Sequence, residues 1–257
     1  MSIARVALGV PLHRLFDYRA PAGEALTSQD VGVRVRVRFG QRVCIGIVAD
    51  VVDTSEFPLE QLKPLEAILR DLPPLPPDWF RLTEFCSSYY QTPLGEDMLS
   101  TLPAGLRRGD PPKARLPRSK PKPQAPQEAP ELTGEQQQVL AAIDAHRGGF
   151  HAFLLHGVTG SGKTEVYLRL IERALAAGRQ TLLLVPEINL TPQLEARVAA
   201  RFPDAGLVSL HSELTEAARM RNWKAAFDGR ARLVLGTRLA VFTPMPELGL
   251  IIVDEEH

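Results

Sequence analysis

The sequence feature that most constrains the fold is the octapeptide GVTGSGKT at residues 157–164. It matches the pattern G-x-x-x-x-G-K-[ST] and lies between a short apolar run at 153–156 and a helix-period segment at 164–177. Glycines let the backbone turn tightly and aim N–H groups at phosphates, and the helix start adds positive potential. The octapeptide therefore predicts a phosphate-binding loop between a strand and a helix.

Beyond residue 131, short apolar runs alternate with helix-period segments. Short buried strands that alternate with helices are typical of a parallel sheet covered by helices, so this part predicts an α/β domain. The predicted helices are 134–146, 164–177, 192–202 and 214–227, and the predicted strands are 153–156, 181–185, 206–210, 232–235 and 248–253.

Acidic residues follow the last apolar run, in the order Asp254-Glu255-Glu256-His257. The carboxyl end of a parallel strand is where such a sheet presents its ligands. Asp254 is placed to hold Mg²⁺ opposite Thr164, and Glu255 to orient an attacking water. Alone, this tetrapeptide would be typical of a solvated acidic turn; its position after the phosphate loop, on a later strand, favours the catalytic interpretation.

The first hundred residues have a different pattern. Residues 31–39 read V-G-V-R-V-R-V-R-F, a strict alternation that predicts a strand with valines on one face and arginines on the other. A second β-rich run covers 43–52, and Gly40-Gln41 predicts the turn between them. Residues 1–45 carry seven arginines against three acids. Such a patch can meet a phosphate backbone, although a solvated charged face is the simpler interpretation.

Three zones follow from these patterns: a β-rich domain at 1–105, a linker at 106–130 and an α/β domain at 131–257. Proline and lysine dominate the middle zone, which predicts an extended, disordered linker. A helix is expected at 77–90, with core packing for Trp79, Leu82, Phe85 and Tyr89. The net charge is zero, the two cysteines suggest no metal site or disulfide framework, and no apolar run is long enough to span a membrane.

Longer strings narrow the interpretation. HGVTGSGKTEVYL (156–168), LVPEINLTPQ (184–193), LGTRLAVFTP (235–244) and LGLIIVDEEH (248–257) resemble superfamily 2 helicases, and more closely the PriA family of replication-restart helicases. VALGVPLHRLFDY (6–18), VRVRFG (35–40) and PLEQLK (58–63) resemble the N-terminal DNA-binding domain of that family. The resemblance implies a small β-rich DNA-binding domain followed by a RecA-like helicase lobe with a parallel sheet.

The resemblance also implies a function. Members rebuild the replication machinery at stalled or collapsed forks, unwind DNA with 3′-to-5′ polarity using ATP and Mg²⁺, and help to assemble the primosome. Their N-terminal domain captures a DNA 3′ end, in a pocket that corresponds here to Phe16, Asp17, Gly40 and Lys63. Phe16 would stack on a base, Asp17 would accept a hydrogen bond from the 3′-hydroxyl, Gly40 would allow close approach, and Lys63 would pair with a phosphate. Without the family, these would be a core phenylalanine, a turn glycine and surface charges.

In the helicase lobe the resemblance assigns further roles. Gln136 corresponds to the glutamine that reads adenine, with Gln137 and Gln138 adjacent as alternatives in register. Lys163, Asp254 and Glu255 are the expected catalytic residues, and Thr164 and Asp254 the Mg²⁺ ligands. Single-stranded DNA contacts are expected at Thr191, Thr237 and Arg238. The expected ATP-binding residues are Gln136, Gly157, Val158, Thr159, Gly160, Ser161, Gly162, Lys163 and Thr164.

The sequence departs from the family in two ways. Only the Pro/Lys-rich stretch occupies the place of a winged-helix segment, and the second helicase lobe and the zinc-binding cysteines of the family's C-terminal half are absent. We therefore expect a fragment that binds ATP, Mg²⁺, forked DNA and single-stranded 3′ ends, and that hydrolyses ATP poorly. By resemblance, its partners are primosome proteins and single-strand-binding protein, and it is a monomer in the bacterial cytoplasm, at the nucleoid, without membrane contact.

Two other interpretations stay open. One is a module that binds DNA ends and ATP without turnover. The other is an unrelated phosphate-loop enzyme, such as a small-molecule kinase, which leaves the basic N-terminal strands and the acidic strand end without a role.

Overall fold

The computed structural model describes residues 2–110, 130–146, 148–158, 160–186 and 192–254. The chain divides into two compact units, which are described separately below. The first comprises Met1–Leu116, Glu213–Lys224 and Phe242–Pro244, and the second comprises Pro117–Ser212, Ala225–Val241 and Met245–His257. Most of the predicted linker falls at 111–129 and lies outside the described residues.

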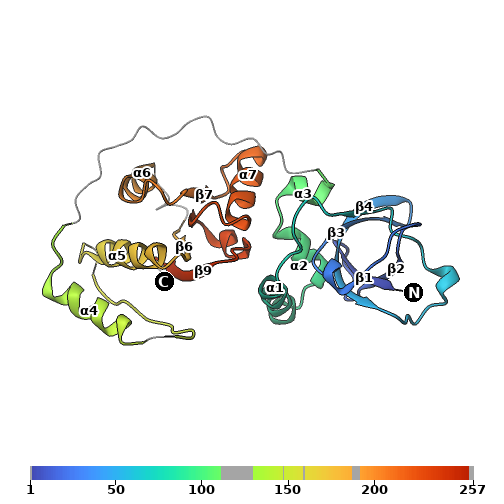
Figure 1. Ribbon diagram of the computed structural model, residues 1–257, viewed down its shortest axis with the longest axis horizontal. Coiled ribbons are helices and arrows are strands. Elements are labelled where there is room, and N and C mark those ends of the chain that lie inside the picture. The colour runs from blue at the N-terminus through green and yellow to red at the C-terminus, as the bar shows by residue number, and fades with distance from the viewer. Residues whose placement is uncertain (1, 111–129, 147, 159, 187–191, 255–257) are drawn as a thin grey trace. The chain divides into compact units, whose positions relative to one another are not determined.

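The first unit is built on a five-stranded antiparallel sheet with the order β2-β1-β4-β3-β5 (Figure 1). The predicted hairpin is present, since Phe39 pairs with Arg42 and Gly40 has the positive φ of 59° that a tight turn favours. The strands are β1 (Ile3–Leu8), β2 (Phe16–Arg19), β3 (Arg34–Phe39), β4 (Arg42–Val52) and β5 (Ala67–Leu69).

Strand β3 shows the alternation that its sequence predicts. Val35 and Val37 are fully buried in the core of the unit, while the arginines between them point to the other face of the sheet. The strand begins at Arg34 rather than at residue 31. The reason is Gly32, whose φ of 90° breaks the extended conformation and brings the backbone against Leu75. The Leu75 N–H donates to the Gly32 carbonyl oxygen at 3.0 Å, and the Gly32 N–H donates to the Val48 carbonyl oxygen at 2.8 Å.

Three helices lie on one side of this sheet (Figure 1): α1 (Pro77–Tyr90), α2 (Leu94–Ser100) and α3 (Ala104–Arg108). The predicted helix at 77–90 is confirmed, but its predicted core is only partly correct. Trp79 is buried, whereas the side chains of Phe85 and Tyr89 are 61% and 68% exposed. These two aromatic residues lie on a different side of the helix from Trp79 and Thr83, which form its covered face.

The second unit contains a four-stranded parallel sheet with the order β7-β8-β6-β9, which confirms the predicted fold class. Its strands are β6 (Gln180–Leu184), β7 (Val208–Leu210), β8 (Leu233–Gly236) and β9 (Leu248–Val253). Helix α5 (Lys163–Ala176) packs against β6 and β9, with Ile171 fully buried in the core. The other helices of this unit are α4 (Gly134–Asp144) and α6 (Pro192–Arg201), whereas most of α7 (Glu216–Phe227) belongs to the first unit.

The strand predicted at 153–156 is wrong. These residues belong to neither sheet, and Phe153 and Leu154 are 49% and 84% exposed. The ring of Phe153 instead lies 5.3 Å from that of His146 at the end of α4, and 6.3 Å from that of His151. A strand exists only through its paired neighbour, and an apolar run of four residues does not specify one.

No helix among the described residues combines the length and the apolar character needed to cross a bilayer.

Candidate nucleotide and DNA sites

The phosphate loop ends in two glycines whose conformations suit its proposed task. Gly160 and Gly162 have φ values of 81° and 84°, in the left-handed region that side chains disfavour. Gly162 is the N-cap of α5, so the loop leads directly into the positive end of a helix. Space around Gly160 is open, since a Cβ built there would meet nothing within 4 Å. The predicted residue Thr159 lies outside the described residues.

Lys163 folds back over this loop. Its ammonium group donates hydrogen bonds to the carbonyl oxygens of Gly157 and Val158, at 2.5 and 3.3 Å. The neighbouring Thr164 is half-buried in the first turn of α5. A cation and a helix N-terminus therefore converge on one loop, and both favour a bound phosphate.

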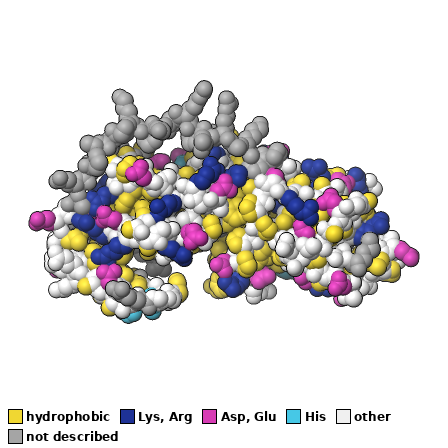
Figure 2. Space-filling model, viewed as in Figure 1, with side chains coloured by type: hydrophobic (Ala, Val, Ile, Leu, Met, Phe, Trp, Pro, Cys, Tyr) yellow, Lys and Arg dark blue, Asp and Glu magenta, His cyan; other side chains and the backbone are white. Residues whose placement is uncertain are grey.

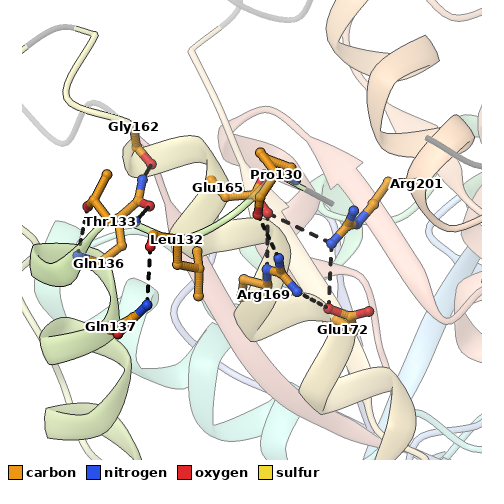
Figure 3. Close-up of polar contacts among 10 residues, drawn as sticks. All are labelled: Pro130, Leu132, Thr133, Gln136, Gln137, Gly162, Glu165, Arg169, Glu172 and Arg201. Carbon is orange, nitrogen blue, oxygen red and sulfur yellow. Dashed lines mark hydrogen bonds and ion pairs between the residues drawn. The ribbon is translucent and has the colours of Figure 1, made fainter. Parts of the chain in front are cut away.

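Gln136 connects α4 to the same loop (Figure 3). Its Oε1 accepts a hydrogen bond from the Thr133 backbone N–H at 2.9 Å, which completes a capping box at the start of α4. Its Nε2 donates to the Gly162 carbonyl oxygen at 3.2 Å. Gln137 instead donates to the Leu132 carbonyl oxygen. The structure thus places Gln136, rather than Gln137, against the loop.

Glu165 is a buried acid that the sequence analysis missed, directly after Thr164. Its carboxylate lies 3.1 Å from Arg169 on the next helical turn and 3.8 Å from Arg201 on α6 (Figure 3). Arg169 also donates to the Pro130 carbonyl oxygen at 3.0 Å. This network ties the start of α5 to α6 and to the segment that precedes α4. The i,i+4 spacing of Glu165 and Arg169 was the available sequence signal for it.

Asp254 follows β9, and its backbone N–H donates to the Leu184 carbonyl oxygen at the end of β6, at 2.9 Å. Because α5 packs against both strands, the helix that carries Lys163 and Thr164 contacts the strand that leads to Asp254. Glu255 lies outside the described residues, as does Thr191. Of the other two predicted DNA contacts, Thr237 is buried after β8 and Arg238 is exposed beyond it.

The four residues predicted to surround a DNA 3′ end are gathered around β2. Phe16 and Asp17 are its first two residues. The ring of Phe16 meets that of Phe39 at 4.9 Å, which brings the Gly40 turn to this end of the strand. At the other end, the Arg19 N–H donates to the Lys63 carbonyl oxygen at 3.1 Å. Segments that are far apart in the sequence therefore meet along one short strand.

Two of these side chains have partners that the sequence did not reveal. The guanidinium of Arg14 lies 5.0 Å over the Phe16 ring, and Phe16 itself is a core residue that is only 9% exposed. The Asp17 carboxylate accepts a hydrogen bond from the Ser55 hydroxyl at 2.5 Å and lies 3.9 Å from Arg5. No sequence pattern links Asp17 to Ser55, because the two are 38 residues apart.

Basic side chains do not form one continuous surface on the face drawn in Figure 2. Lys and Arg are intermixed with Asp and Glu on both units. The arginines of β3 illustrate this, since Arg34 pairs with Asp71 at 2.7 Å and Arg38 with Glu66 at 2.8 Å. On this face, therefore, local clusters rather than a continuous basic surface would have to account for binding of phosphate.

Comparison with known proteins matches each half of the chain separately. A PriA family model described as the 3′ DNA-binding domain matches residues 5–103. A model described as the DEAD/DEAH box helicase matches residues 133–257. The two matches leave out the Pro/Lys-rich stretch and include every candidate site residue named above.

Curated relatives carry the name Replication restart protein PriA. The protein of Haemophilus influenzae is 36% identical over 331 residues, which include all of this chain and 44% of the relative. That of Treponema pallidum is 35% identical, over 96% of this chain and 37% of the relative. That of Synechocystis is 50% identical over 130 residues, or 51% of this chain and 15% of the relative. The chain thus spans less than half the length of these relatives.

Proposed function

Because the chain belongs to the PriA family of replication restart proteins, we propose that it grips DNA 3′ ends and carries the ATP-binding lobe of a 3′-to-5′ DNA helicase. The motor would recognise stalled or collapsed forks and start primosome assembly, in contact with primosome proteins and single-strand-binding protein, in the bacterial cytoplasm. One observation carries the proposal: a 3′ DNA-binding domain and a phosphate-loop helicase lobe follow each other on one chain.

At the N-terminal site, the proposal gives the residues around β2 complementary tasks. Asp17 accepts a hydrogen bond from the terminal 3′-hydroxyl, in competition with Ser55, and Lys63 pairs with a nearby phosphate. Gly40 lets a strand approach the turn closely, because no side chain projects there. Phe16 would stack on the terminal base, which requires that Arg14 move off its ring and that the ring, now 9% exposed in the core, become accessible.

At the helicase site, the residues fit ATP and Mg²⁺. The backbone N–H groups of 157–164 and the ammonium of Lys163 hold the phosphates, and Lys163 exchanges its bonds to Gly157 and Val158 for bonds to phosphate oxygens. Thr164 and Asp254 supply oxygen ligands of the kind that Mg²⁺ prefers, and Gln136 pairs with adenine. Hydrolysis of bound ATP to ADP and phosphate would supply the free energy for unwinding. Glu255 orients the attacking water, and Thr191, Thr237 and Arg238 contact single-stranded DNA.

We expect the chain on its own to turn ATP over slowly or not at all. The matches cover a single helicase lobe, and phosphoryl transfer in the superfamily draws charge-stabilising groups from two lobes. Steady-state ATPase with forked DNA measures this directly. Turnover at the rate of an intact motor would contradict it. A zinc site, by the same resemblance, would belong to the family's C-terminal half.

Binding of three labelled DNA substrates tests the proposal: a fork with a free 3′-hydroxyl at its branch, the same fork with that end blocked, and a blunt duplex. We expect the tightest binding to the free 3′ end. Equal affinity for all three substrates would contradict the proposal that the chain captures DNA 3′ ends. An absence of DNA binding, together with ATP binding, would favour the small-molecule kinase.

A further inference from the structure

A cavity of about 400 Å³ lies in the N-terminal unit, and none of the residues assigned above lines it. Its volume is within the range of ordinary small-ligand pockets. Leu8, Ile45 and Leu99 contribute apolar wall, from β1, β4 and α2. Three arginines also line it: Arg36 on β3, and Arg107 and Arg108 on α3.

Arg36 differs from the two arginines that flank it on the same face of β3. Arg34 is buried; its Nη2 donates to both carboxylate oxygens of Asp71 at 2.7 and 2.8 Å, and its Nη1 donates to the Leu106 carbonyl oxygen at 2.9 Å. Arg38 pairs with Glu66 at 2.8 Å. Within the described part of the chain, the guanidinium of Arg36 has no carboxylate partner. The middle arginine of the row therefore keeps its donors available and presents them to the cavity.

Helix α3 brings the other two arginines to the same place. It ends at Gly109, whose φ of 80° turns the chain back over the cavity wall. A Cβ built on Gly109 would lie 2.9 Å from Ile45 Cδ1 and 3.5 Å from Arg36 Nη2, so this turn closes on β3 and β4. Arg108 shares its charge with Asp110 at 3.2 Å. Three guanidinium groups thus line a partly apolar cavity, and one of them is paired with Asp110, which is not among the lining residues.

A purely structural role does not account for this arrangement. Arginines in the last turn of a helix stabilise its negative end, which would explain Arg107 and Arg108. It does not explain Arg36, which comes from a strand far away in the sequence. Arg36 is only partly buried, so water can solvate its guanidinium, and an anion that enters the cavity can take the place of that water.

We propose that this cavity binds a backbone phosphate of DNA, with Arg36 and Arg107 as donors and the apolar wall against the sugar or base of the same nucleotide. The planar donors of arginine match two phosphate oxygens at once. Arg107 and Arg108 are exposed, so a phosphate can reach both arginines from solvent. The inference rests on the proposed function, because that function supplies the DNA whose backbone phosphate would enter the cavity. It adds a second contact, separate from the 3′-end residues, that fixes the path of the strand.

The salt dependence of fork binding tests this second contact. In Arg36→Gln, one phosphate contact is lost, so the slope of log K against log salt becomes shallower by about 1. Affinity at low salt falls about tenfold, equally for forks with free and with blocked 3′ ends. Arg81→Gln is the matched control, because Arg81 is an exposed arginine of the same unit that does not line the cavity. Its slope should equal that of the wild type.

Several results would overturn the inference. One is an identical slope in Arg36→Gln and Arg81→Gln, measured on protein whose unfolding midpoint shows that both variants are folded. A second is a cavity that binds a free mononucleotide but no DNA strand. In that case dAMP would bind to the wild type and not to Arg36→Gln, while the two proteins would show the same salt slope for fork binding. The failure of end capture is a separate result, because a wild-type chain that ignores the 3′ end would still show the slope change.

Discussion

The two units hold their candidate sites in different ways. In the N-terminal unit, the strands themselves position the DNA-end residues, since β2 carries Phe16 and Asp17 and pairs along its whole length with β1. In the helicase lobe, the phosphate loop precedes all four strands of the sheet and is attached to the fold through α5 and the Gln136 contact. The first site is therefore built around a strand of the sheet, with Gly40 and Lys63 in neighbouring connections, whereas the phosphate loop of the second depends on one helix end.

Sequence separation explains part of this contrast. Strands β1 to β4 lie within residues 3–52 and pair antiparallel. In the lobe, β6 pairs in parallel with β8 and β9, with helices between them in the sequence. Parallel pairing needs such long crossovers, so the lobe is assembled from contacts that are far apart in the chain. We therefore expect a destabilising substitution in one unit to leave the free energy of unfolding of the other unit unchanged.

Core truncations should produce the largest effects and should stay within one unit. Ile47 and Leu235 are fully buried, one in each sheet. Ile47→Ala and Leu235→Ala should each lower the free energy of unfolding of their own unit by about 2–5 kcal/mol. Hydrogen exchange, read separately on peptides from β4 and β8, measures this. Equal loss of protection in both units from either variant would show that they fold as one body.

Lys163→Ala should greatly weaken nucleotide binding and leave DNA binding by the N-terminal unit unchanged. The variant loses the ammonium that hydrogen-bonds over the loop, so affinity for ATP–Mg²⁺ should fall about 100-fold, as measured by calorimetry. Fork affinity in the absence of nucleotide should match the wild type. Unchanged ATP affinity would refute the assignment of the loop, and a loss of 3′-end capture would refute the separation of the two sites.

A smaller effect should distinguish the two neighbouring glutamines. Gln136→Ala loses both the capping box and the bond to Gly162, and should lower ATP affinity about tenfold and weaken the preference for ATP over GTP. Gln137→Ala is the matched control, since its side chain bonds only Leu132. Nucleotide competition assays on the two variants decide the matter; identical affinities would mean that neither glutamine reads the base.

The smallest effect concerns pH and the N-terminal sheet. Burial, with a further contribution from Cys44, raises the pKa of Tyr18 to about 12 from its usual value of 10. The protonated phenol therefore stabilises the fold below pH 10, and this contribution is lost as the pH rises towards 12. Urea unfolding at pH 9 and pH 11 should show the stability of the wild type falling relative to Tyr18→Phe. A constant difference would contradict the shift.

How far the sequence predicts the fold depends on whether a feature is local. The helix that follows the loop at 157–164, the hairpin turn at Gly40 and the parallel sheet of the lobe follow from local patterns, and the structure contains each of them. The strand prediction at 153–156 is wrong because four apolar residues do not specify a neighbouring strand. The prediction of core packing for Phe85 and Tyr89 is wrong because helical spacing does not show which side of a helix is covered.

The site residues show the same limit. The family motifs identify Asp17 and Gln136, but their partners Ser55 and Gly162 are 38 and 26 residues away. The cavity around Arg36 is a stronger case, because α3 supplies its other arginines from about seventy residues further along the chain. Only the folded chain reveals that Arg34 and Arg38 are paired while Arg36 faces a cavity.

The central claim is that residues around β2 recognise a DNA 3′ end, and Asp17→Ala tests it most directly. Asp50→Ala is the control, because Asp50 also lies near Arg5 but is half-exposed and belongs to β4. Forks with free and blocked 3′ ends are titrated against both variants. We predict that Asp17→Ala loses the preference for the free end while its salt-dependent affinity for the blocked fork stays unchanged, and that Asp50→Ala keeps the preference. An equal loss of affinity for both forks in Asp17→Ala, or an intact preference, would contradict the account.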